Sequence, residues 1–331
     1  MKQLFKWVVV SLLVIILLMS FEACTGRDVE NTVAVKVAVL KGPTGMGMVK
    51  LMEDNANHQE NVKYEFIVSG APDELIGKVV NGEVDMAALP TNMAATLYQK
   101  THGQIQLTAV NTLGVLYIVE NGTEINSIND LKGKKMYASG KGATPDYALR
   151  YILKQNGIDP EKDIEVDFSV QHAEVAATFA AGDAPIALLP QPHVTSALMK
   201  NKNARIALDL TEEWKKAAKG TSQLAVGCMV VQKDFAQKHE QILSQFLQQY
   251  EQSVEWVNAN AAEAGILIEK HGILPNAKLA ETALPKCNIV FMDANESKDL
   301  LNGFYKVLFD FNPASVGGKI PDEAFYYIPQ E

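Results

Sequence analysis

Residues 82–90, GEVDMAALP, decide the fold, because a close copy, GDAPIALLP, occupies residues 182–190. The same offset of one hundred residues pairs KGPT at 41–44 with KGAT at 141–144. Without a gap, eleven positions between residues 38 and 90 match their counterparts, against roughly three expected from average composition. Two unrelated units of similar composition are the alternative. Solenoid and propeller units repeat roughly every 20 to 50 residues, so the longer offset favours two lobes instead.

Around both copies, short apolar runs alternate with longer amphipathic segments, which is typical of a mostly parallel sheet covered by helices on both faces. We expect strands at residues 33–40, 62–68, 86–89, 135–138, 164–168, 186–189 and 204–208. We expect helices at residues 48–55, 72–81, 90–99, 145–156, 173–181 and 192–199. The chain is therefore predicted to be α/β, with one strand and helix alternation in each copy.

Two long apolar runs, residues 107–120 and 224–232, bracket the second copy. We expect the chain to cross into the second lobe at about residue 118 and to return at about residue 225. The remainder from residue 235 onward is mainly helical in pattern and would complete lobe one. The predicted division is a signal peptide at 1–23, a tether at 24–32, lobe one at 33–117 and 226–331, and lobe two at 118–225.

The N-terminus has the pattern of an export signal. Lys2 and Lys6 precede an uncharged run at residues 7–21, shorter than the about 20 apolar residues of a membrane-spanning helix. Cys24 follows Ala23 at the place where a bacterial lipoprotein signal ends. We therefore expect Cys24 to carry a lipid that anchors the mature chain outside the cell membrane. Secretion without a lipid and an uncleaved anchor are the alternatives.

Composition describes an ordinary globular chain, with 47% hydrophobic and 21% charged residues. The formal net charge of −9 argues against nucleic acid or an anionic membrane surface as a partner, because both attract basic patches. Cys228 and Cys287 lie in apolar stretches, so we favour buried free thiols over the disulfide that an exported protein permits. The six histidines lack zinc-chelating spacing, so no metal or cofactor is expected.

Four loops that each join a strand to a helix lie at corresponding places in the two copies, at residues 42–47, 90–92, 139–145 and 190–193. Ligands of open α/β sheets bind outside the carboxyl ends of the strands. Helix N-termini at that edge offer free N–H donors and a partial positive charge. If the lobes face one another, these loops line one cleft suited to a carboxylate, sulfonate, phosphate or carbonyl group.

The chain resembles the extracytoplasmic substrate-binding proteins of ABC importers, in particular the branch that binds nitrate, alkanesulfonates, taurine and thiamine-pyrimidine precursors. The motifs are NGEVDMAALPTNMAATL at 81–97, ALLPQPHVTSAL at 187–198 and GGKIPDEAFYYI at 317–328. The resemblance implies a type II periplasmic-binding-protein fold, with two α/β lobes joined by two crossover strands. Such a protein closes around one small molecule and delivers it to a membrane ABC permease, without covalent chemistry.

The resemblance also implies ligand-binding residues on both sides of the cleft. Carried over by position, they are Thr44, Gly45, Met46, Thr91 and Asn92 on one side, and Ser139, Lys141, Gly142, Thr144, Gln191 and His193 on the other. Structural roles that involve no ligand remain as alternatives for several of these residues. The threonines at 44 and 144 are suited to capping helices, Met46 to packing in the core, Lys141 to a solvated surface and His193 to the rim.

Arginine is scarce, with only Arg27, Arg150 and Arg205 in the chain and none in a candidate loop. A bidentate guanidinium clamp is therefore not expected, which disfavours free amino acids as ligands. A small anion held by backbone N–H groups and Lys141, or a heterocyclic or aromatic compound, fits better. We expect a monomer.

Two other functions remain as alternatives. A fold-related enzyme of cofactor biosynthesis is disfavoured, because the chain lacks Gly-x-Ser-x-Gly, a P-loop and an evident nucleophile beside a base. A ligand-sensing surface protein, which presents its bound state to a receptor rather than an importer, would share the same fold and cleft.

Overall fold

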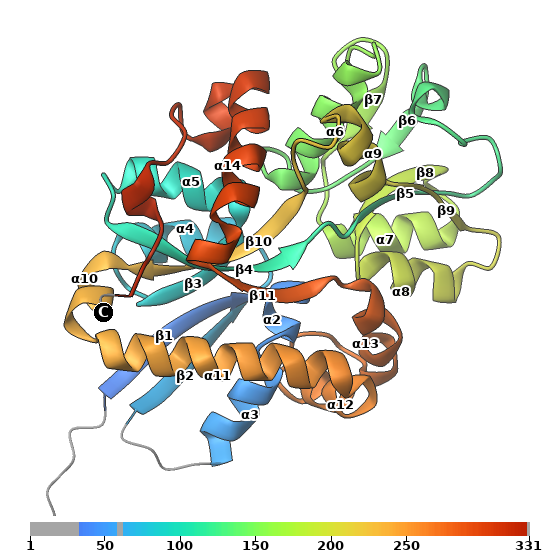
Figure 1. Cartoon of the computed structure of the whole chain (residues 1–331). Helices are drawn as coiled ribbons and strands as arrows, with labels where there is room; N and C mark the ends of the chain where they lie inside the picture. Colours follow the sequence, from blue (N-terminus) through green and yellow to red (C-terminus); the bar gives the residue numbers. More distant parts are fainter. Residues whose placement is uncertain (1–32, 58–61, 330–331) are drawn as a thin grey trace, which may run out of the picture.

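The computed structural model describes residues 33–57 and 62–329, so the predicted signal peptide, Cys24 and the tether lie outside the described residues. Within them the chain forms two sheets, with strand orders β11-β4-β10-β3-β1-β2 and β7-β6-β8-β5-β9. Figure 1 shows the two sheets as separate layers, each covered by its own helices. We call the first sheet with its helices lobe one and the second sheet with its helices lobe two.

The strands of lobe one are β1 (Val33–Leu40), β2 (Val62–Ser69), β3 (Met86–Pro90), β4 (Ile105–Leu113), β10 (Ala225–Gln232) and β11 (Ile289–Asp293). Its helices are α2 (Pro43–Met46), α3 (Val49–Asn57), α4 (Asp73–Val80), α5 (Thr91–Lys100), α10 (Lys233–Lys238), α11 (Glu240–Ala259), α12 (Ala261–Lys270), α13 (Ala277–Ala283) and α14 (Ala294–Phe311). Alternate residues of β1 enter two cores, because successive side chains of a strand point to opposite faces. Val37 and Val39 pack toward α3 and α11, whereas Ala38 and Leu40 pack toward α4, α5 and α14.

The strands of lobe two are β5 (Leu116–Glu120), β6 (Lys135–Tyr137), β7 (Glu165–Asp167), β8 (Ile186–Pro190) and β9 (Arg205–Asp209). Its helices are α6 (Thr144–Gln155), α7 (His172–Ala181), α8 (His193–Lys200) and α9 (Leu210–Ala217). Helices α7 and α8 cover one face, and α6 and α9 cover the other. Short 3-10 turns complete the chain at Ile128–Leu131, Leu284–Lys286, Pro313–Val316 and Glu323–Phe325.

The internal repeat is visible in the topology. In lobe one β1 pairs in parallel with β2 and β3, and β10 joins β3 in the antiparallel sense. In lobe two β6 pairs in parallel with β7 and β8, and β5 joins β8 in the antiparallel sense. The copied stretches therefore become equivalent central strands, β3 and β8, which confirms the α/β fold with two lobes.

The crossings differ in detail from the prediction. The run at 107–120 is two strands, because β4 ends at Leu113 in one sheet and β5 begins at Leu116 in the other. A Cβ at Gly114, between them, would lie 2.2 Å from the hydroxyl oxygen of Thr211, so glycine is needed where the chain passes α9. The chain thus changes sheets at about residue 114 rather than 118. The helix α9 and the strand β11 were not predicted from the sequence. The exact limits of the two lobes stay a prediction.

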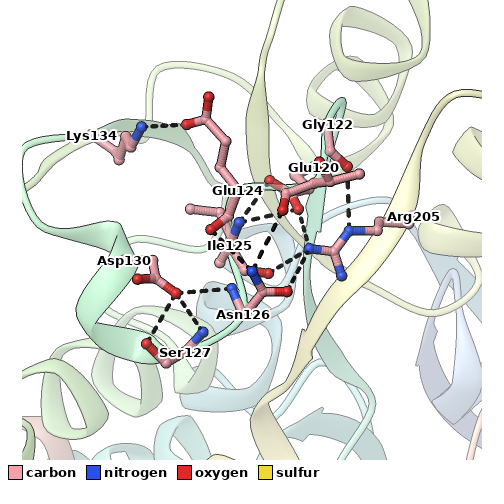
Figure 2. A network of polar contacts seen from close by, with 10 residues as sticks. Glu120, Gly122, Glu124, Ile125, Asn126, Ser127, Asp130, Lys134 and Arg205 are labelled. Atoms are coloured by element: carbon pink, nitrogen blue, oxygen red, sulfur yellow. Dashed lines mark hydrogen bonds and ion pairs between the residues drawn. The ribbon is translucent and has the colours of Figure 1, made fainter.

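A polar network secures the outer edge of lobe two (Figure 2). The guanidinium of Arg205 forms an ion pair with Glu120, which is only 3% exposed. It also donates to the carbonyl oxygens of Gly122, at 3.2 Å, and Ile125, at 2.6 Å. Glu120 accepts the backbone N–H of Ile125 at 3.1 Å. The loop after β5 is therefore bound to β9 by a buried charge, and Arg205 serves structure rather than a ligand.

Two further features bear on the sequence predictions. Cys228 in β10 and Cys287 before β11 are both buried and free, as favoured from the sequence. Burial raises the pKa of the Cys287 thiol to about 12, which makes it unreactive near neutral pH. Among residues 33–57 and 62–329, none of the helices combines the length and apolar character needed to cross a bilayer.

Candidate functional site

A cleft of about 310 Å³ lies between the two lobes. The loops that follow the parallel strands of both lobes form its walls. These loops are 40–44 after β1, 70–73 after β2, 139–145 after β6, 168–172 after β7 and 190–193 after β8, with Pro90 and Met93 after β3. The cleft thus occupies the carboxyl edge of both sheets, the place where open α/β sheets bind ligands.

Seven of the eleven predicted site residues line this cleft: Thr44, Ser139, Lys141, Gly142, Thr144, Gln191 and His193. The structure brings them together from both lobes, as the repeated loops predicted. Whether they contact a ligand stays a prediction.

The other four predicted residues do not line the cleft. Met46 is fully buried in the core between α3 and α11, and Gly45 lies buried in α2, where a Cβ would approach the Leu40 carbonyl oxygen to 2.4 Å. Thr91 is buried at the start of α5, and its carbonyl accepts the Tyr305 hydroxyl at 3.1 Å. These three serve the core of lobe one, because the first turn of each helix faces its own sheet. Asn92 instead contacts lobe two.

Asn92 links α5 of lobe one to the loop before α6 of lobe two. Its Oδ1 accepts the Thr144 hydroxyl at 3.0 Å, and its Nδ2 donates to the Gly142 carbonyl at 3.4 Å. The two lobes therefore touch directly beneath the cleft. They also meet where Phe311 of α14 packs edge-on against Tyr151 of α6, with ring centroids 5.9 Å apart.

The backbone conformation explains the glycine in each of the two copied KGxT motifs. Gly42 and Gly142 both have positive φ, +116° and +75°, and Gly140 has φ +82°. Only glycine adopts such conformations readily, so these turns bring the backbone to the cleft without strain. The adjoining Lys41 and Lys141 side chains are exposed, one from each lobe.

Two imidazoles stack on the lobe-two side of the cleft. His172 and His193 begin α7 and α8, and their ring centroids lie 5.7 Å apart at 25°. Burial lowers the pKa of His193 to about 4, and burial together with His193 lowers the pKa of His172 to about 3. Both rings are therefore neutral at pH 7, and among the described lining residues Lys41 and Lys141 carry the positive charge.

The rest of the lining combines apolar surface with one carboxylate. The apolar residues include Met93, Phe168, Val170 and several prolines. Among the described residues, Asp73 is the carboxylate that lines the cleft. The described lining contains no arginine, and Arg150 pairs with Asp146 and Glu161 instead. Among the residues that the structure describes, no cluster of three or more histidine, cysteine or acidic side chains is arranged to hold a metal ion.

Sequence reasoning missed the loops after the edge strands β2 and β7, and with them Phe168 and His172. A signal was present, because Ser69 and Ser169 are identical at the same offset of one hundred residues. Ser69 ends β2, and Ser169 lies two residues beyond the end of β7, in the loop that reaches the cleft. A third pair of equivalent loops followed from that identity.

The class of protein follows from a comparison with known families. Residues 52–255 match the family described as ABC transporter, phosphonate, periplasmic substrate-binding protein. The chain belongs to this family. The match covers the whole sheet of lobe two and the strands β2, β3, β4 and β10 of lobe one.

Individual relatives agree with this class. An ABC transporter protein of Parabacteroides distasonis is 28% identical, with a TM-score of 0.75 over 90% of this chain and 100% of its own. SsuA of Escherichia coli, a periplasmic aliphatic sulphonate binding protein, shares the fold at 17% identity, with a TM-score of 0.70 over 88% of this chain and 95% of its own. YtlA of Bacillus subtilis (strain 168), named as a binding protein, is 24% identical over 46% of this chain. The match covers only 43% of YtlA.

Proposed function

We propose that this protein binds one small molecule in the cleft between its lobes and delivers it to a membrane ABC permease. The observation that carries the proposal is that loops from the carboxyl ends of both sheets converge on one cleft. A ligand there contacts both lobes at once, so its binding energy favours the closed arrangement. A permease that recognises the closed form would then receive loaded protein preferentially.

We propose a small organic anion with an apolar body as the ligand. Its charged group would lie near Lys141 and the first turn of α6, where no side chain caps the helix N-terminus. Its apolar part would pack against Met93, Phe168 and Val170. The cleft volume of about 310 Å³ is at the lower end for ligand pockets, which favours a small molecule. Phosphonate in the family description and sulphonate in the name of SsuA point to two such anions.

The remaining features of the proposal follow from the N-terminus. Cys24 would carry a lipid that tethers a monomer at the outer face of the cell membrane. No catalytic step is part of this function, since the ligand is released unchanged.

A thermal-shift screen of the purified protein tests the proposal. The panel contains alkylphosphonates, alkanesulfonates, nitrogen heterocycles and free amino acids. A ligand at a hundredfold excess over its dissociation constant stabilises the folded state by about 2.7 kcal/mol, which raises the unfolding temperature visibly. We expect a shift with a phosphonate or sulfonate, and none with amino acids.

Two matched lysine variants locate the binding. Lys141→Ala removes the charge in the cleft, whereas Lys162→Ala removes an exposed charge of the same lobe that lies outside the cleft lining. The shift should shrink in Lys141→Ala and persist in Lys162→Ala. If no compound shifts the protein, and mass spectrometry of denatured protein finds no small molecule carried through purification, the binding function is wrong.

A further inference from the structure

We infer that Asn92 and Asp146 are positioning residues that hold Gly142 of the cleft loop through its carbonyl and its N–H group, and that Asn92 does so only when the lobes are closed. The inference rests on the proposed function, because it assigns the loop at 139–144 to the ligand. It reassigns Asn92, which the sequence placed among the ligand contacts, to the contact between lobes.

Asp146 binds the backbone N–H group of Gly142. It is the third residue of α6 and is 4% exposed. Its Oδ2 accepts the Gly142 N–H at 2.9 Å, and its Oδ1 pairs with Arg150 one helical turn further on. Arg150 also pairs with Glu161, so the guanidinium is held from a second direction. The buried carboxylate is therefore committed to the loop and to α6, and is not a ligand contact.

The loop needs such an anchor because of its glycines. Gly140 and Gly142 both have left-handed backbone angles, and neither has a side chain to restrict its alternatives. Ordering a backbone residue costs conformational entropy. Because Asp146 already sets the conformation of this loop, Lys141 and Ser139 are presented to the cleft before a ligand arrives. The entropy of ordering the loop then does not reduce the affinity for the ligand.

Asn92 holds the carbonyl group of the same residue, Gly142, from lobe one. It is 2% exposed, and Nδ2 donates both to the Gly142 carbonyl, at 3.4 Å, and to the Ser315 carbonyl, at 3.2 Å. Ser315 lies in the turn after α14, so the amide is oriented by its own lobe. Oδ1 is then directed at the Thr144 hydroxyl, 3.0 Å away in lobe two.

These bonds across the lobes require the lobes to be together. In the described conformation α13 of lobe one also lies against α8 of lobe two (Figure 1). When the lobes separate, the Thr144 hydroxyl and the Gly142 carbonyl lose Asn92, and the loop keeps only Asp146. Closure and the shape of the ligand-binding loop are thus coupled through one amide side chain.

Hydrogen exchange of the purified protein without added ligand tests this coupling. We expect the backbone N–H groups of residues 139–144 to exchange about tenfold faster in Asn92→Ala than in wild type, since one or two hydrogen bonds of typical strength are lost. Thr144→Val removes the same bond from the other lobe at nearly constant volume and should act in the same direction. Thr96→Ala is the matched control, because its hydroxyl bonds only within α5, to the Asn92 carbonyl at 3.2 Å.

The Asp146 variants supply a rescue test. Asp146→Asn keeps an oxygen for the Gly142 N–H and should retain slow exchange there, whereas Asp146→Ala should lose it. A role limited to the stability of α6 would instead change both variants alike, through the ion pair with Arg150. Exchange in the loop that is the same for Asn92→Ala, Thr144→Val and Thr96→Ala overturns the coupling, and equal exchange in the two Asp146 variants overturns the role of Asp146.

Affinity for a defined probe separates this inference from the proposed function. With methylphosphonate as the probe, Asn92→Ala should bind about tenfold more weakly than Thr96→Ala, which corresponds to about 1.4 kcal/mol. Methylphosphonate binding that is equal in both variants contradicts the coupling. A wild type that binds no member of the screening panel counts against the proposed function, while the exchange comparison still decides for or against the positioning roles.

Discussion

Replacing Glu120 by glutamine tests the energetic role of the network at the edge of lobe two. Breaking a buried ion pair by removing one charge costs about 3–5 kcal/mol when the remaining charge is fully buried. Here the Arg205 side chain is 35% exposed and keeps the carbonyl oxygens of Gly122 and Ile125. Water and these carbonyls compensate part of the loss, so we expect Glu120→Gln to lower the free energy of unfolding by about 2 kcal/mol.

The assay is urea denaturation, with the free energy obtained by linear extrapolation. Glu120→Ala also deprives the buried Ile125 N–H of its acceptor, so it should cost about 1 kcal/mol more than Glu120→Gln. Lys134→Met is the control, because the Lys134–Glu124 pair in the same network is solvent-exposed and its loss should leave the midpoint unchanged. A Glu120→Gln protein within about 0.5 kcal/mol of wild type would refute the reasoning.

Three further predictions address the cleft, the anchor and acid stability. Thr144→Trp should abolish the thermal shift by any ligand while circular dichroism stays native, because the hydroxyl lies buried where loop and lobes meet; unchanged affinity would remove this loop from the site. Cys24→Ser should move the protein from the membrane fraction to the soluble fraction, and continued retention would indicate an uncleaved N-terminal helix. Hydrogen bonds from Lys270 and Asn57 lower the pKa of Glu53 from 4.5 to about 2, so its ionised form stabilises the fold above pH 4.5 and this stabilisation is lost as the pH falls toward 2. Acid unfolding of Glu53→Gln should lack this part of the pH dependence, and an identical acid profile would contradict the assignment.

The fold was largely predictable because its signals are local. The valine-rich strand β1 and the copied strands β3 and β8 were legible as apolar runs between turn residues. The strand β11 was not, because IVFMD at Ile289–Asp293 is a short apolar run in a helical region, and its place beside β4 depends on residues 180 positions apart. The crossing at Gly114 was also hidden, because β4 and β5 read as one long apolar run, in which Asn111, Thr112 and Gly114 are only brief interruptions.

The candidate site was predictable only in part. Motif position correctly brought Lys141, Thr144 and His193 to the cleft, since strand ends of one sheet share an edge. It placed Met46 and Thr91 there wrongly, because the rotation of a helix about its axis decides which first-turn side chain faces the core. It missed Phe168 because this residue follows an edge strand, and the twist of the sheet decides whether the loop after an edge strand reaches the cleft.

By itself, the sequence determined the two copies, the α/β alternation and the loops at which a ligand is expected, because propensity and hydrophobic period act over a few neighbouring residues. Only the tertiary structure decided that Asn92 turns from the cleft to the opposite lobe and that Asp146 is committed to Gly142. Asn92 meets Thr144 across 52 positions of sequence, in a contact whose length depends on how the helices of both lobes pack. Such distances depend on the packing of whole lobes, which no local pattern encodes.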